Sequence, residues 1–229
     1  MFGDSHLSRI NRRLFDKSLV NCKSLLKCFN GGNSEQLEYY VIPTLNREKP
    51  DIVIIHIGSN NANIANAENN NVDEIAQNIL RIAKYCKDSG VNHVFISGIL
   101  PKHNLVLTKF IRKVNDILKE FCLSNLDNIH FISNGNINNG FVSGDGVHLI
   151  KDGTHILASN FVNCVNNITH YWLNSDQESI KDTSETSVEY IEIISDLKES
   201  CEMKKNSSCE NKDNTIDELD KLRKQNINR

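Results

Sequence analysis

Four short polar segments carry the residue types that an acyl-transfer reaction needs. The first is Gly3-Asp4-Ser5-His6, which places a serine at a turn before a helix predicted from about Leu7. Such a turn exposes the Ser5 hydroxyl, and a helix N-terminus favours developing negative charge, so Ser5 is a candidate nucleophile. A serine in this position on its own is more often only a helix cap.

Two further segments can supply hydrogen-bond donors to an oxyanion. Residues 29–32 (FNGG) contain Gly31, and glycine lets a backbone N–H come close to a developing charge. Residues 58–61 (GSNN) contain Asn60, whose side-chain amide can donate to the same charge. Each segment alone is equally well explained as a polar turn in an asparagine-rich chain.

The fourth segment is DGVH at residues 145–148. With Asp145 and His148 three positions apart, one turn of chain brings the carboxylate close to the imidazole. The carboxylate can then fix the tautomer of the ring while the other ring nitrogen takes a proton from a serine. The alternative is a solvent-exposed aspartate and histidine in a glycine-rich loop.

Strand-like and helix-like patterns alternate along the part of the chain that must position these segments. Runs rich in apolar, β-branched residues predict strands at residues 51–57, 91–100 and 128–133, and a short mixed run before Gly31 predicts another at residues 24–29. Apolar residues at helical spacing predict helices at residues 34–45, 72–87, 107–121 and 153–172. The alternation predicts an α/β domain with a parallel sheet, whose functional loops follow the carboxyl ends of the strands.

The order of the four segments on these elements resembles the SGNH hydrolases, also called GDSL esterases. The resemblance covers about residues 1–172 and implies a flavodoxin-like three-layer α/β/α sandwich with a parallel sheet. It implies that Ser5 is the nucleophile, His148 the general base and then acid, and Asp145 the carboxylate that orients the ring. It also implies an oxyanion hole made by the backbone N–H groups of Ser5 and Gly31 and the side chain of Asn60, with no metal or organic cofactor.

Two positions depart from the pattern of that family. Asn61 stands where the family usually has aspartate, and Leu149 stands where many members have proline. The blocks IHIGSNN and DGVHLIKDGTHILASN are similar in sequence to the esterase-type domains of animal retroelement-encoded proteins. We therefore carry a retroelement-derived sub-family as a hypothesis.

The resemblance implies a serine hydrolase that cleaves small or short-chain acyl or acetyl esters, since no long insertion could form a lipase-like lid. The alternative is a catalytically inactive binding or assembly module with the same fold, derived from a retroelement. A nucleotide-binding flavodoxin-like domain is disfavoured, because the loops contain no glycine-rich phosphate-binding run.

The start of the chain differs from what the resemblance implies. In this fold the G-D-S turn should follow a buried central strand of about five apolar residues, whereas only Met1 and Phe2 precede Gly3. We expect the first strand to be largely missing and the chain to be a few residues short at its N-terminus. Loss of a central strand would leave neighbouring ladder groups unpaired, which would weaken both folding and activity.

The balance of basic and acidic residues changes near residue 174. Residues 175–229 carry nine basic and fourteen acidic side chains, whereas residues 1–174 carry seventeen and fifteen. We expect a globular domain at 1–174 and an acidic, mostly disordered tail at 175–229. Within the tail, Ile191–Ile194 with its acidic neighbours resembles a SUMO-interacting motif, although a marginal strand or helix explains the run more simply.

The composition of the chain argues against several classes of protein and indicates a cell compartment. A net charge of −3 argues against a nucleic-acid-coating or membrane-surface protein, and no apolar stretch is long enough to span a bilayer. Seven cysteines without a C-x-x-C pair, and the lack of a secretory signal before Gly3, predict reduced thiols in a cytoplasmic or nuclear protein. His6 and His56 flank the predicted site, where they are more simply core or rim residues than catalysts.

Overall fold

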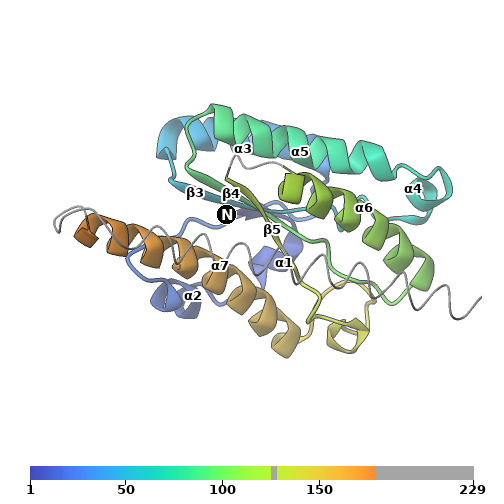
Figure 1. Ribbon diagram of the computed structural model, residues 1–229. Coiled ribbons are helices and arrows are strands. Elements are labelled where there is room, and N and C mark those ends of the chain that lie inside the picture. Colours follow the sequence, from blue (N-terminus) through green and yellow to red (C-terminus); the bar gives the residue numbers. More distant parts are fainter. Residues whose placement is uncertain (125–127, 179–229) are drawn as a thin grey trace, which may run out of the picture. The chain divides into compact units, whose positions relative to one another are not determined.

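The computed structural model describes residues 1–124 and 128–178, with side chains described as far as His170, and Met1–Asn174 form one compact unit. Five strands make one sheet in the order β2-β1-β3-β4-β5, and every neighbouring pair is parallel (Figure 1). The strands are β1 (Phe2–Gly3), β2 (Lys27–Cys28), β3 (Ile52–His56), β4 (His93–Ser97) and β5 (Ile129–Ile132).

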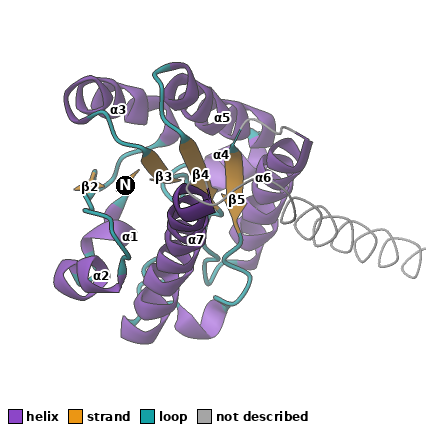
Figure 2. Ribbon diagram, turned by 60° about the vertical axis from the view of Figure 1, so that its left-hand side comes forward, coloured by secondary structure: helices purple, strands orange, loops and turns teal. Residues whose placement is uncertain are grey.

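Helices cover both faces of the sheet, as Figure 2 shows. The helices are α1 (Ser5–Ser8), α2 (Arg12–Ser18), α3 (Ser34–Glu48), α4 (Ile64–Glu68), α5 (Val72–Asp88), α6 (Leu105–Ser124) and α7 (Lys151–Glu178), with a 3-10 turn η1 at Asn139–Phe141. On β3, Ile55 belongs to a core cluster with residues of α3, α5 and α6, whereas its neighbour Ile54 belongs to a second cluster with residues of α1, α2 and α7. This alternation along one strand confirms the predicted three-layer α/β/α sandwich.

The predicted elements are present with shifted ends, and two short helices were not predicted. α3 runs three residues beyond its predicted end, α7 runs beyond residue 172, and β4 covers only the middle of the predicted run at 91–100. α2 and α4 begin after Asn11 and Asn63, whose side chains accept hydrogen bonds from the first turn. In a chain with so many asparagines, an asparagine cap does not stand out from an ordinary polar loop.

The central strand β1 is only two residues long, yet it is paired on both sides. Phe2 lies opposite Lys27 of β2 and Ile55 of β3, and the ladder continues as Asp4 N–H donates to the His56 carbonyl at 3.1 Å. The neighbouring strands are therefore bridged at the level of the G-D-S turn, and the unpairing that we expected there does not occur. The close approach requires glycine at position 3, because a Cβ there would lie 2.2 Å from the His56 carbonyl oxygen.

Three other predictions concern cysteines, membranes and the tail. The five cysteines within the described residues are all free, as predicted, and no helix in this part of the chain is long and apolar enough to cross a membrane. The predicted tail at 175–229 lies almost entirely outside the described residues, and the run Ile191–Ile194 lies wholly outside them.

Candidate active site

The predicted site residues follow the carboxyl ends of neighbouring strands. Ser5 comes two residues after β1, Gly31 three residues after β2, and Asn60 four residues after β3. The strands end level with one another, because Gly3 lies opposite both Cys28 and His56. The sheet therefore brings these three loops to one edge, as expected for a parallel α/β sheet.

Ser5, His148 and Asp145 form a continuous chain of hydrogen bonds. The Ser5 Oγ lies 2.9 Å from His148 Nε2, and His148 Nδ1 lies 2.8 Å from Asp145 Oδ2. With the Nδ1 proton directed to the carboxylate, Nε2 is left to accept the serine proton. This is the geometry that a serine nucleophile with a histidine base requires.

The Asp145 carboxylate is held by its own loop. Its Oδ1 accepts hydrogen bonds from the backbone N–H groups of Val147 (2.9 Å) and His148 (2.8 Å) and from the Ser143 hydroxyl (2.8 Å). These bonds, together with the one from the His148 ring, hold the pKa of Asp145 well below its usual range. The carboxylate therefore stays ionised and oriented although 45% of its side chain is exposed.

The predicted oxyanion donors lie on touching loops. Asn60 Nδ2 donates one hydrogen to the Gly32 carbonyl at 2.8 Å, which fixes the amide and leaves its second hydrogen for another acceptor. Gly31 adopts a positive φ of 76°, and a Cβ built there would meet no atom within 4 Å. The loop thus turns sharply and leaves space beside Gly31, as an oxyanion donor needs.

A polar network behind Asn60, in which Asn61 and Asn78 are buried and Glu35 is exposed, was missed by sequence reasoning. Asn61, 3% exposed, accepts from the Ser34 N–H (2.8 Å) and donates to both carboxylate oxygens of Glu35 (2.9 and 3.1 Å). Asn78 on α5 also donates to Glu35, at 3.3 Å. An aspartate at position 61 would set a second carboxylate against Glu35, which accounts for the departure noted at this position.

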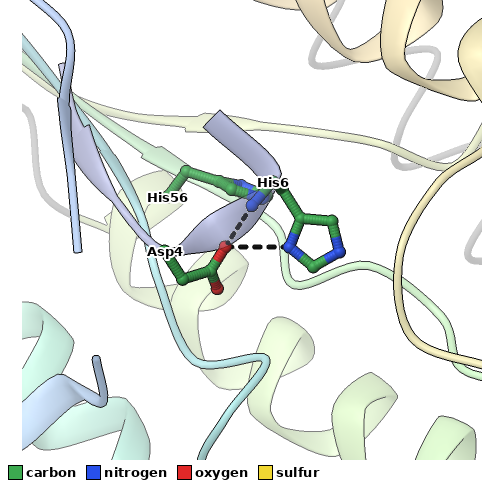
Figure 3. A group of neighbouring side chains, drawn as sticks. All are labelled: Asp4, His6 and His56. Carbon is green, nitrogen blue, oxygen red and sulfur yellow. Dashed lines mark hydrogen bonds and ion pairs between the residues drawn. The ribbon is translucent and has the colours of Figure 1, made fainter. Parts of the chain in front are cut away.

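A second group of titratable side chains lies under the serine turn (Figure 3). Asp4, His6 and His56 are all buried, with candidate ligand atoms within 4.8 Å of one another. Burial lowers the pKa of His56 to about 4, so this ring is neutral, and its Nδ1 lies 2.9 Å from the Ser97 hydroxyl. Burial opposes ionisation of Asp4, but the hydrogen bonds from the ring and the backbone N–H of His6 hold its pKa below the usual value.

One carboxylate and two imidazoles are a ligand set that suits Zn²⁺. However, Asp4 Oδ1 already accepts two hydrogen bonds from His6, one from its backbone N–H (3.1 Å) and one from its ring Nδ1 (2.8 Å). The other oxygen, Oδ2, is buried without a hydrogen-bond partner. Asp4 Oδ1 and His6 Nδ1 thus satisfy one another, and a metal would have to displace the Asp4–His6 hydrogen bond.

Lys102 connects two of the site loops. Its side chain is buried, and its Nζ donates to the Ala62 carbonyl at 2.8 Å, which joins the segment after β4 to the segment after β3. Burial lowers the pKa of Lys102, while the charge of Asp4 opposes this shift. Sequence reasoning gave no role to this lysine, because nothing near it in the chain indicates that it is buried.

Comparisons with known proteins agree with this architecture. The sequence profile of the family described as GDSL-like Lipase/Acylhydrolase matches residues 2–161. An acetyl esterase crystallised with an acetate ion has a TM-score of 0.60 and 17% identity, over 73% of this chain and 96% of that one. No curated protein sequence is similar enough to match.

Two other solved structures share the fold to a similar degree. A carbohydrate esterase family 3 protein from Talaromyces cellulolyticus has 18% identity and a TM-score of 0.60, over 73% of this chain and 96% of that one. A GDSL-like lipase from Bacteroides thetaiotaomicron has 19% identity and a TM-score of 0.60, over 73% and 86%. Since the family profile spans nearly the whole compact unit, the chain belongs to the GDSL-like lipase/acylhydrolase family and is a carboxylic ester hydrolase.

Proposed function

We propose that the protein hydrolyses small or short-chain acyl esters, acetyl esters above all, with Ser5 as the nucleophile. The observation that carries the proposal is the hydrogen-bonded series from Ser5 Oγ through His148 to Asp145. It lies beside a loop with an open glycine and a fixed side-chain amide, which are the parts that acyl transfer requires.

In the proposed reaction, Ser5 Oγ attacks the ester carbonyl as His148 Nε2 takes the hydroxyl proton. Asp145 stabilises the imidazolium that results. The carbonyl oxygen becomes an oxyanion, which accepts from the N–H groups of Ser5 and Gly31 and from Asn60 Nδ2. His148 then gives its proton to the leaving alkoxide, and a water activated in the same way releases the acyl group from Ser5.

Two observations favour small acyl groups. Within the described residues, the predicted site loops carry no long insertion that would correspond to a lid over a long acyl chain. Two of the proteins with this fold are described as an acetyl esterase and a carbohydrate esterase. Since identity to both is below 20%, they support the choice of first substrates and leave the natural ester to be found. A retroelement-derived sub-family likewise stays a hypothesis.

The test is hydrolysis of p-nitrophenyl acetate, butyrate and octanoate by the wild-type protein, Ser5→Ala and Ser89→Ala. Ser89 is exposed at the end of α5 and serves as the matched control. We expect turnover that declines with chain length, is unchanged in Ser89→Ala and falls to background in Ser5→Ala. Equal rates for wild type and Ser5→Ala would overturn the proposal and favour the catalytically inactive binding or assembly module.

A further inference from the structure

His6 occupies a position between the nucleophile turn and the loop that carries the base. Its ring is 2% exposed and makes two hydrogen bonds, with Nδ1 2.8 Å from Asp4 Oδ1 and Nε2 3.1 Å from the Val147 carbonyl. Asp4 precedes the proposed nucleophile, and Val147 precedes the proposed base. One buried side chain therefore spans the two segments that must be aligned for proton transfer.

We propose that His6 is a positioning residue, which sets the distance between Ser5 and His148 by holding the Val147 carbonyl. The inference rests on the proposed function, because it concerns the same serine and histidine. The hydrogen bonds of His6 go to Asp4 and Val147, while its ring packs beside that of His148 with the centroids 5.5 Å apart in a tilted arrangement. Its effect on the reaction is transmitted through the backbone of Val147.

The hydrogen bonds of the loop that carries His148, residues 143–149 (the base loop), explain why the contact between His6 and Val147 matters. Within the loop, Asp145 accepts from the N–H groups of Val147 and His148, and these bonds fix the loop's internal shape without fixing its place. Within the described residues, two backbone carbonyls of the loop accept hydrogen bonds from outside it: that of Val147 from His6, and that of Gly146 from the His103 N–H at 3.1 Å. Of these two hydrogen bonds, the one from His6 reaches the nucleophile turn.

The Ser5–His148 contact of 2.9 Å has little tolerance for displacement. A shift of the base loop by about 1 Å would lengthen it beyond hydrogen-bond range, and misplacements of that size cost about 10²-fold in rate. The loss would appear in the rate of the chemical step, because the substrate-binding surfaces would be unchanged.

Two substitutions separate the two hydrogen bonds of His6. His6→Gln places an amide nitrogen close to the position of Nε2, so it keeps a donor for Val147 and gives up the one to Asp4. His6→Asn places its amide nitrogen close to Nδ1, so it keeps a donor for Asp4 and gives up the one to Val147. Matching changes at His155, which is exposed on α7, control for the loss of a histidine elsewhere.

The experiment measures kcat and KM on p-nitrophenyl acetate for these variants and for Ser5→Ala. Hydrogen–deuterium exchange of residues 143–149 and thermal unfolding are measured alongside. We expect His6→Gln to keep kcat within about 5-fold, and His6→Asn to lose about 10²-fold in kcat with KM within 2-fold. Exchange in the base loop should rise about 10-fold in His6→Asn alone.

Each other outcome contradicts a stated part of the proposal. If His6→Asn matches wild type and His6→Gln does not, the ring serves only to satisfy the Asp4 charge. If both variants fail to fold while the His155 controls fold, His6 is a folding element. One equivalent of zinc in the purified wild type, lost in both variants, would make Asp4, His6 and His56 a metal site. Background rates in wild type, equal to Ser5→Ala, refute the proposed function, and loop exchange then decides the role of His6.

Discussion

The two halves of the site are built in different ways. The base half, residues 143–148, is partly exposed, and Asp145 makes its hydrogen bonds to residues at most three positions away in the chain. The proposed oxyanion half comprises Gly31, Asn60 and the network around Asn61, and it depends on hydrogen bonds between residues 26 to 43 positions apart. One half is a local turn, and the other exists only once α3, β3 and α5 are packed together.

The difference predicts how each half responds to substitution. A change in the base half alters chemistry with little effect on packing, because the loop keeps its internal turn and lies at the surface. A change in the network of the oxyanion half leaves a buried polar group unpaired, so it lowers stability and rate together. Measuring kcat and unfolding temperature for the same variants therefore tests the comparison.

The largest expected effect is that of His148→Ala. In the proposed mechanism His148 accepts the Ser5 proton, so its removal should lower kcat by about 10⁴-fold on p-nitrophenyl acetate. The unfolding temperature should change by no more than about 2 °C, since the ring is partly exposed. A fall in unfolding temperature as large as that of a core variant such as Leu157→Ala would contradict the difference in stability that we expect between the two halves.

The next largest effect is expected for Asn60→Ala. Loss of one oxyanion donor costs about 3 kcal/mol of transition-state stabilisation, which is about 10²-fold in kcat with KM little changed. Asn60→Asp is the matched variant, because it keeps the shape of the side chain and removes the donor. A rise in KM with unchanged kcat in both variants would show that Asn60 binds the substrate without stabilising the oxyanion.

Asp145→Asn should lower kcat because the amide no longer stabilises the imidazolium of His148. The loss should be about 10²-fold, smaller than the loss of about 10⁴-fold for a buried triad aspartate, because water also reaches the exposed Asp145 side chain. The lowered pKa of Asp145 adds a pH dependence. A carboxyl group with a depressed pKa stabilises the fold above its unfolded pKa of about 4, and this contribution is lost as the pH falls through the folded pKa. Thermal unfolding at pH 7 and pH 3 should therefore show a wild-type advantage over Asp145→Asn that shrinks at pH 3. A constant difference would contradict the cause given for the shift.

The smallest effect on rate is expected for Asn61→Asp, with the clearest effect on stability. The new carboxylate would face Glu35, so we expect a loss of about 1–3 kcal/mol in the free energy of unfolding and about 10-fold in kcat. Glu35→Gln in the same chain should restore part of both losses, because the repulsion is removed. Additive effects of the two substitutions would show that they do not interact.

Sequence reasoning succeeded where the determining contacts are local. The Asp145–His148 contact follows from the spacing of two residues in one turn, and β3 follows from a run of apolar, β-branched residues. The network of Glu35, Asn61 and Asn78 could not be predicted in this way, because its members come from three elements that meet only in the fold. His6 is buried, as expected of a core residue, but its contact with Val147 could not be predicted for the same reason, because the two residues are 141 positions apart.

The two-residue strand β1 is a further case in which tertiary context decided the outcome. Two residues are too few to show a hydrophobic pattern. We expected the neighbouring strands to be unpaired because only Met1 and Phe2 precede Gly3. In the fold, Gly3 and the backbone of Asp4 bond to segments on both sides, and the ladder is continuous where Ser5 needs support. For the support of Ser5, the backbone hydrogen bonds on both sides of the turn matter more than the number of residues in β1.

The role of Ser5 is tested most directly by reaction with a fluorophosphonate probe and mass spectrometry of the labelled peptides. The probe traps a serine only when its oxygen is activated by a base and the adduct is stabilised by oxyanion donors. We predict one adduct, on Ser5, in wild type and in Ser89→Ala, and none in Ser5→Ala or His148→Ala. A wild-type protein that stays unlabelled, or that is labelled on another serine, would contradict the assignment.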